Sequence, residues 1–280
     1  LSLAEVARVL GGDAPLLGRA LAAHEAALEA RARHLHDTVH KVRKLRAELD
    51  RGTMSVANVV SSVRRAENQI SVTFELPWPW GGEPFELRGL RGLTFITGPL
   101  GSGKTRLAMR MAEKIPGASF VSEDRLIDGA AAAKEALAAQ PELAARVRRS
   151  ISEIVQAGGN DCSALLALLT ALEAEGATVH VVDMLESGLD EATQEALICF
   201  LRRRAPDARP LIALTRSTSI LDVELVGPDE AIILCPANHS PPMPVAPVRG
   251  APGYEALATC LAAPAVRART EGVVAIRRRA

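Results

Sequence analysis

Short apolar segments with strand-like composition alternate with helix-like stretches between residues 69 and 235. The strand-like segments are residues 70–76, 84–87, 93–97, 119–122, 178–183, 211–215 and 229–235. Runs that are apolar throughout are typical of strands buried on both faces, and parallel sheets are built from such strands. The alternation with helices therefore predicts an α/β domain whose mainly parallel sheet is sandwiched by helices.

The first fifty residues have a different pattern and are rich in alanine, leucine, arginine and glutamate. Apolar residues recur there every seven positions, at Leu28, Leu35, Val42 and Leu49. Such heptads favour an antiparallel helical hairpin or a two-stranded coiled coil, and a single long helix packed on its own domain is the alternative. We therefore expect a helical arm over residues 1–52 and an α/β domain over residues 53–280 that ends in a proline-rich extension.

Composition narrows the function classes only slightly. Lys and Arg together number 33, as do Asp and Glu, so no global charge excess indicates nucleic acid or a membrane surface as a partner. The four cysteines are far apart in the chain, which favours buried thiols in a reducing compartment. No apolar run approaches the roughly 18 residues of a membrane-spanning helix, and we expect a cytoplasmic protein without membrane contact. The chain begins with Leu1 rather than methionine, which leaves open whether it is a fragment of a longer product.

A glycine-rich motif follows the apolar strand 93–97. Its residues are Gly98, Pro99, Leu100, Gly101, Ser102, Gly103, Lys104 and Thr105, and they match the pattern G-x-x-x-x-G-K-[ST] at every fixed position. Glycines let successive backbone amides curl around phosphate oxygens, and the helix expected over residues 106–114 adds its positive dipole end. We expect ATP as the ligand, with Lys104 at the β- and γ-phosphates, Thr105 on Mg²⁺ and Arg106 beside them.

A second acidic position lies at the end of the apolar strand 178–183. Asp183 ends this strand, and a carboxylate at the end of a strand is what a phosphate-binding loop protein needs to hold the Mg²⁺ shell. Thr105 and Asp183 are therefore the predicted magnesium ligands.

The neighbours of Asp183 carry a resemblance to a known family. Residues 183–190 read Asp-Met-Leu-Glu-Ser-Gly-Leu-Asp and resemble the Walker B and D-loop segment of ABC-type ATPases, Asp-Glu-Pro-x-Ser-Gly-Leu-Asp. Residues 156–161 resemble a degenerate signature loop, and residues 211–217 resemble the switch segment, with Arg216 where histidine is usual. The resemblance spans about residues 69–235 and implies a nucleotide-binding domain in which Trp78 or Trp80 stacks on adenine; either tryptophan could equally be a core or turn residue.

The departures from the family pattern bear on catalysis. Met184 occupies the position of the glutamate that polarises the attacking water, and a thioether cannot take a proton. Glu186 is the candidate replacement, with a solvated loop acid as the alternative, and Arg216 can contact the γ-phosphate as a cation. With Lys104 and Asp183, these two residues complete the predicted catalytic set. The pattern implies tight ATP binding with slow hydrolysis.

The start of the chain carries a second resemblance. Residues 1–7, followed by the heptad helix, are similar to the end of the DNA-binding domain and the dimerisation helix of MerR-type transcription regulators. This implies a homodimer, with DNA contacts only through a region that precedes Leu1. The leading hypothesis is an ATP-dependent dimer switch attached to a regulator. A P-loop kinase of a small molecule and a non-hydrolysing interaction protein are the alternatives.

Overall fold

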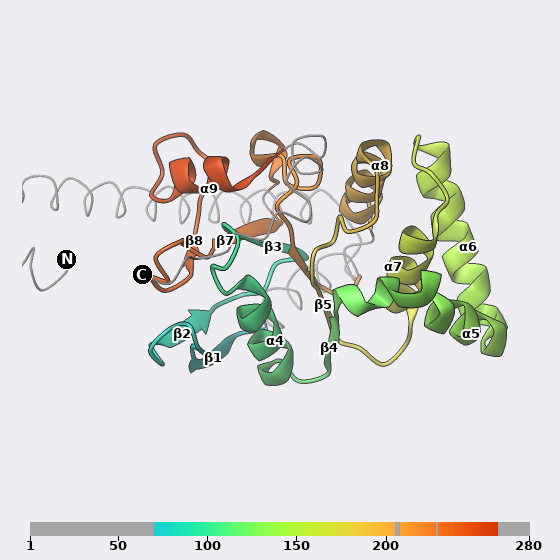
Figure 1. Cartoon of the computed structure of the whole chain (residues 1–280), viewed down its shortest axis with the longest axis horizontal. Coiled ribbons are helices and arrows are strands. Elements are labelled where there is room, and N and C mark those ends of the chain that lie inside the picture. The colour runs from blue at the N-terminus through green and yellow to red at the C-terminus, as the bar shows by residue number, and fades with distance from the viewer. Residues whose placement is uncertain (1–69, 205–207, 228, 263–280) are drawn as a thin grey trace, which may run out of the picture. The chain divides into compact units, whose positions relative to one another are not determined.

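The computed structural model describes residues 70–204, 208–227 and 229–262, and the structural statements below refer to these residues (Figure 1). The predicted helical arm over residues 1–52 and the resemblance to MerR-type regulators lie outside the described residues. Both therefore stay predictions.

A six-stranded sheet forms the centre of the described domain, with the strand order β4-β5-β6-β3-β7-β8. Its strands are β3 (Leu93–Thr97), β4 (Ala118–Val121), β5 (Val179–Val182), β6 (Leu211–Leu214), β7 (Glu230–Leu234) and β8 (Met243–Pro244). All neighbouring pairs are parallel except β7 and β8. The prediction of a mixed α/β domain with a mainly parallel sheet is confirmed.

A separate two-stranded antiparallel sheet precedes the central sheet. It consists of β1 (Val72–Glu75) and β2 (Pro84–Leu87), with Phe74 opposite Phe85 in the register. The two rings lie 5.3 Å apart between centroids, a distance at which aromatic rings attract each other beyond their area burial. This pair anchors the hairpin, and the connection between its strands carries both tryptophans of the chain.

Helices connect the parallel strands. They are α4 (Lys104–Lys114), α5 (Ala131–Ala139), α6 (Pro141–Gln156), α7 (Ser163–Glu173), α8 (Glu191–Arg202) and α9 (Tyr254–Cys260), with the 3₁₀ helices η1 (Glu123–Gly129) and η2 (Val223–Leu225). Local sequence explains several ends: Pro141 occupies the first turn of α6, where a missing amide costs nothing. The Asp190 carboxylate caps α8 by accepting from the Thr193 amide.

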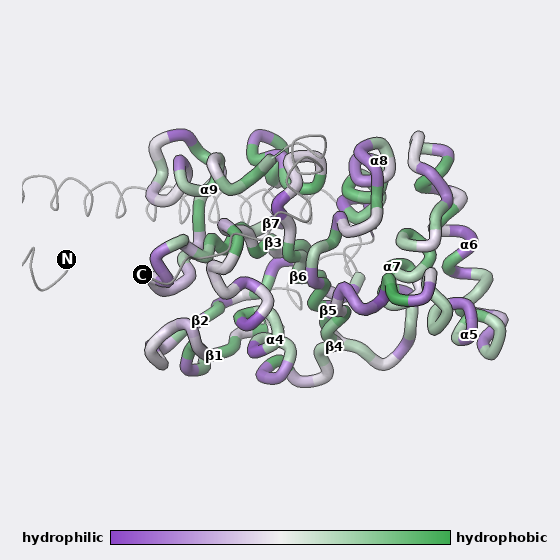
Figure 2. The backbone as a smooth tube through the Cα atoms, viewed as in Figure 1, coloured by the Kyte–Doolittle hydropathy of each residue, from purple (hydrophilic) through white to green (hydrophobic). Residues whose placement is uncertain are grey.

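Two apolar clusters cover the opposite faces of the sheet. Successive strand residues point to opposite faces, so Phe95 packs in the cluster formed with α6, α7 and α8, whereas Ile96 packs in the cluster formed with α4 and the β1–β2 hairpin. Figure 2 shows this as hydrophobic central strands between helices that alternate in polarity. Each fully buried aliphatic or aromatic side chain contributes about 1.5–3 kcal/mol, so the two clusters dominate the stability of the domain.

One detail of the fold differs from the sequence expectation. The proline-rich extension contains a strand that the sequence pattern does not predict, because Met243 and Pro244 pair with Leu234 and Ile233 as strand β8. A proline fits there because β8 is an edge strand, where an absent amide breaks no ladder. Among the residues that the structure describes, no helix combines the length and the apolar character needed to cross a bilayer.

His180 is a buried titratable residue in the middle of the sheet. It lies on β5 with 1% of its surface exposed, and its Nδ1 lies 3.0 Å from the Ser119 hydroxyl on β4. Its pKa is lowered to about 4, mainly by burial and in smaller part by the positive charges of Arg209 and Arg204. The imidazole is therefore neutral in the folded protein at pH 7.

We expect acid to destabilise the domain through His180. Its folded pKa lies below the ordinary value of 6.5, so its contribution is complete above pH 6.5 and falls as the pH drops towards 4. Between pH 7 and pH 5 the loss is about 2 kcal/mol. Urea unfolding followed by tryptophan fluorescence measures it, with His180→Gln as the variant that cannot titrate in this range. An equal loss in both proteins would contradict the prediction.

Candidate functional site

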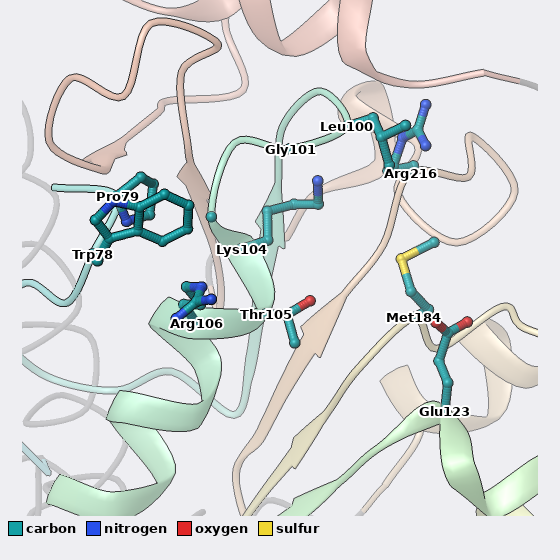
Figure 3. Close-up of a pocket in the computed structure, with 11 residues that line it drawn as sticks. Trp78, Pro79, Leu100, Gly101, Lys104, Thr105, Arg106, Glu123, Met184 and Arg216 are labelled. Atoms are coloured by element: carbon teal, nitrogen blue, oxygen red, sulfur yellow. The ribbon is translucent and has the colours of Figure 1, made fainter. Parts of the chain in front are cut away.

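The candidate site is a cleft of about 440 Å³ at the carboxyl-terminal edge of the parallel strands (Figure 3). The segments after β3, β4, β5 and β6 all contribute to it, because parallel neighbours end at the same edge. This edge is where open α/β sheets bind their ligands. The lining residues include Trp78, Pro79, Leu100, Gly101, Gly103, Lys104, Thr105, Arg106, Glu123, Met184 and Arg216.

The glycine-rich loop between β3 and α4 is shaped by close backbone approaches. A Cβ atom on Gly98 would lie 2.2 Å from the Cys235 carbonyl oxygen, and one on Gly103 would lie 2.6 Å from the Trp80 ring. Gly103 also has φ +91°, in the left-handed region that favours glycine. Both positions therefore require glycine for steric reasons.

The loop is braced from its outer side by the segment that follows β7. His239 lies with Nε2 3.0 Å from the Gly101 carbonyl oxygen, and this contact requires the tautomer in which Nε2 carries the proton. The nearby Ser240 carbonyl accepts from the Trp80 indole at 3.1 Å. The first contact engages the Gly101 carbonyl of the loop, and the second holds the segment after β7 against Trp80.

Lys104 is the first residue of α4 and is 7% exposed. Its ammonium donates to the carbonyl oxygens of Gly98 at 2.9 Å and Pro99 at 2.8 Å, both in the same loop. Burial lowers the pKa of Lys104 to about 8, and the positive charge of Arg216 adds to this effect. The loop thus holds a buried cation that two neutral carbonyls only partly satisfy.

Asp183 and Thr105 come together beside this lysine. Asp183 is 6% exposed; burial raises its pKa, and a hydrogen bond with the Thr105 side chain opposes the rise. Among the described residues, its Oδ1 has no hydrogen-bond partner. An orphaned buried carboxylate oxygen next to a hydroxyl matches the oxygen ligands that Mg²⁺ prefers, so the residues present fit this ion.

Arg125 fixes the loop that follows β5. Its guanidinium donates to the backbone oxygens of Asp183 at 2.8 Å and Met184 at 2.7 Å, and to that of Ser122 at 3.0 Å. Met184 itself has φ +42°, which is uncommon for a residue with a side chain. Nothing in the sequence marks Arg125, since a half-buried arginine that binds only backbone oxygens leaves no motif.

Glu186 requires a correction. It is 3% exposed, so it is not a solvated loop acid, and it is absent from the residues that line the cleft. Its Oε1 accepts from the Arg216 amide at 2.9 Å. The carboxylate therefore fixes the segment after β6 and does not reach the cleft as the predicted catalytic role requires. Arg216 does line the cleft, as predicted for a residue that contacts phosphate.

The tryptophans require a second correction. Trp80 is 5% exposed and belongs to the cluster around α4, so it is a core residue and cannot stack on a ligand in the cleft. Trp78 is 70% exposed and lines the cleft, and the Arg106 guanidinium lies 4.7 Å from its ring centroid. Trp78 is the aromatic residue available to a ligand.

The charges that line the cleft favour an anion. Lys104, Arg106 and Arg216 supply three positive groups, and Glu123 supplies one negative group. Sequence reasoning missed Glu123, which lies two residues beyond the end of β4. The signal that could have found it is its place after a strand that neighbours the strand of Asp183.

The segment 156–161 lies elsewhere. Gly159 cannot accept a side chain, because a Cβ atom would lie 2.8 Å from Ile154 Cγ2. The Asn160 side chain donates to the Asp190 carboxylate at 2.5 Å, and its amide donates to the Thr193 hydroxyl. The segment is therefore attached to the start of α8, and none of its residues lines the cleft.

No protein-family model matches the chain, and no curated protein matches it. Among solved structures, a bacterial Atm1-family ABC exporter with ATP bound is similar with a TM-score of 0.45 and 14% sequence identity. The similarity covers 60% of this chain and 37% of the exporter chain. This chain therefore corresponds to well under half of the length of the exporter chain.

We expect Gly98→Ala to destabilise the domain by about 3 kcal/mol, because its Cβ atom would collide with the rigid Cys235 carbonyl. Gly101→Ala is the matched control: nothing lies within 4 Å of its Cβ position, and only the left-handed backbone costs about 1 kcal/mol. Urea unfolding of both variants measures the difference. Equal losses would show that the loop is not seated against β7.

Proposed function

We propose that the cleft binds ATP and that the chain is an ABC-type ATPase with slow turnover. The observation that carries this proposal is the buried ammonium of Lys104 at the start of α4, inside a loop whose glycines are sterically required. A buried cation with two carbonyl partners gains strongly when an anion joins it. A polyphosphate supplies that charge, and the start of a helix of this length adds favourable amides.

The other lining residues support the same ligand. Arg216 faces Lys104 across the cleft, where it can pair with the terminal phosphate as a cation (Figure 3). Trp78 offers an exposed ring for the base, since stacking on an aromatic face is worth about 1–3 kcal/mol per base. Arg216 thus suits the phosphates of a nucleotide, and the exposed ring of Trp78 suits its base.

The Thr105 hydroxyl and the Asp183 carboxylate would hold Mg²⁺, which supplies positive charge that neutralises the phosphates. The raised pKa of Asp183 fits this role, because a carboxylate in a costly buried environment gains from a nearby cation. Arg125 keeps the carboxylate in place through the backbone oxygens of Asp183 and Met184.

Slow turnover follows from Met184. This residue lines the cleft directly after Asp183, and its thioether cannot accept a proton from water. A positioned general base contributes a factor of about 10²–10⁴ to a rate, so the absence of a base at position 184 slows hydrolysis to the extent that no other residue replaces it. ATP then serves as a switch ligand more than as a fuel.

Calorimetry with ATP and Mg²⁺ tests the binding site. We expect Lys104→Ala to weaken ATP binding by roughly ten- to a hundredfold, the effect of losing a charge-assisted hydrogen bond. The wild-type affinity should also fall above pH 8, because the Lys104 amine must be reprotonated to bind phosphate. Lys114→Ala, at the exposed end of the same helix, is the control. Absence of binding by the wild type, or an unaffected Lys104→Ala variant, would disprove the site.

We also propose that ATP promotes contact between two copies of the chain. The segment 156–161, which resembles the ABC signature loop, does not line the cleft of its own chain. A second copy is needed to bring such a segment to the nucleotide, and the exposed Leu100 at the rim would be covered by that contact. Attachment to a DNA-binding regulator remains part of this proposal and rests on the residues before the described domain.

Light scattering with and without ATP and Mg²⁺ tests the switch. We expect the weight-average mass to rise towards that of two 29.7 kDa chains when ATP is present, and the Lys104→Ala variant to show no response. A mass that is independent of ATP in the wild type, although calorimetry shows binding, would reject the switch and leave the binding site intact.

A further inference from the structure

Glu123 is the carboxylate that the loops around the cleft bring next to Met184. It lies two residues beyond the end of β4, and β4 pairs with β5 so that Val121 stands opposite Val182. The Asp183 amide donates to the Val121 carbonyl at 2.9 Å, which extends the pairing to the edge where both segments enter the cleft. The pairing of β4 with β5 therefore brings the segments that carry Glu123 and Met184 to the same edge of the sheet.

The position of Glu123 is fixed from both sides. The Ser122 hydroxyl caps η1 by accepting from the Asp124 amide at 3.2 Å. Arg125 ties the same segment to the backbone oxygens of Asp183 and Met184. The side chain that projects from this short segment is therefore held relative to the loop after β5, which is what an acid–base residue needs.

The carboxylate itself is oriented by Ser187. The Ser187 hydroxyl donates to Glu123 Oε1. Within the described part of the chain, no hydrogen bond engages the second oxygen, Oε2, which remains able to accept a proton. Figure 3 shows the Glu123 carboxylate next to the Met184 side chain, on the side of the cleft opposite Thr105 and Lys104.

We propose that Glu123 is the catalytic base of this site, in place of the residue at position 184. The proposal rests on the proposed ATP binding. A water oxygen attacks the γ-phosphorus and forms a new P–O bond, while the bond from that phosphorus to the β,γ-bridging oxygen breaks. The electron pair of the broken bond stays with ADP. The proton of the water passes to Glu123 and returns from there to the solvent.

The chemistry distinguishes Glu123 from the other acids near the cleft. Asp183 is committed to Thr105 and to the fitted Mg²⁺ position, and Glu186 holds the Arg216 amide away from the cleft. Glu123 is the one carboxylate among the described residues that line the cleft. A general base must lie within hydrogen-bond reach of the proton that it takes, and Glu123 lines the cleft in which the reaction would occur.

Single-turnover hydrolysis and ATP calorimetry on the full chain together test the proposal. We expect Glu123→Gln to slow hydrolysis by about a hundredfold or more while the ATP affinity changes less than about threefold, because a base acts on the chemical step alone. Asp124→Asn, an exposed neighbour that does not line the cleft, should retain the wild-type rate. Met184→Glu in the Glu123→Gln background should restore hydrolysis, since it returns a carboxylate to the same wall.

Each other outcome has a definite meaning. An unchanged rate in Glu123→Gln, or a loss of affinity that accounts for the whole effect, would overturn the catalytic role. Wild-type protein that binds ATP and never hydrolyses it would also overturn this role and would leave the proposed binding site standing. Wild-type protein that gives no heat with ATP and Mg²⁺ would instead remove the proposed function itself.

Discussion

The candidate site depends on one buried charge. The Lys104 ammonium lies inside a loop of its own chain, with the Gly98 and Pro99 carbonyl oxygens as its hydrogen-bond acceptors. Removing an ammonium from water costs several kcal/mol, and two neutral acceptors return only part of this. The loop can hold this cation only because Gly98 and Gly103 let it fold tightly against Cys235 and Trp80. The core therefore supports a site that is electrostatically incomplete without an anion.

Charged side chains that bind backbone groups also fix the loops on the other side of the cleft. Arg125 is half-buried and Glu186 is buried, and each binds backbone groups of a segment that enters the cleft. A charged side chain fixes backbone oxygens or amides more firmly than a neutral one, since charge-assisted hydrogen bonds are about twice as strong. The positions of Met184 and Arg216 therefore depend on groups that never reach the cleft.

The sequence predicted the fold and the site to different degrees. Apolar runs located β3 with its correct ends and the other parallel strands of the central sheet to within about one residue, because a strand buried on both faces is mostly apolar. The motif placed Lys104, Thr105 and Asp183 together correctly. It could not separate Trp78 from Trp80, because burial depends on how the hairpin packs on α4. Glu123 and Arg125 were missed, since their roles arise from the pairing of β4 with β5, two strands that are far apart in the chain.

The contrast between Glu186 and Glu123 shows why distance along the chain is a poor guide to chemistry. Glu186 is two residues from Met184, yet the tight turn after β5 directs its carboxylate to the Arg216 amide in the interior. Glu123 is distant in sequence, but the parallel pairing of β4 with β5 brings it to the same edge as Met184. A parallel sheet collects the residues that follow its strands, whatever the length of the crossovers between them. In the proposed site, a base that is absent at one strand end is therefore supplied from the neighbouring strand of the same sheet.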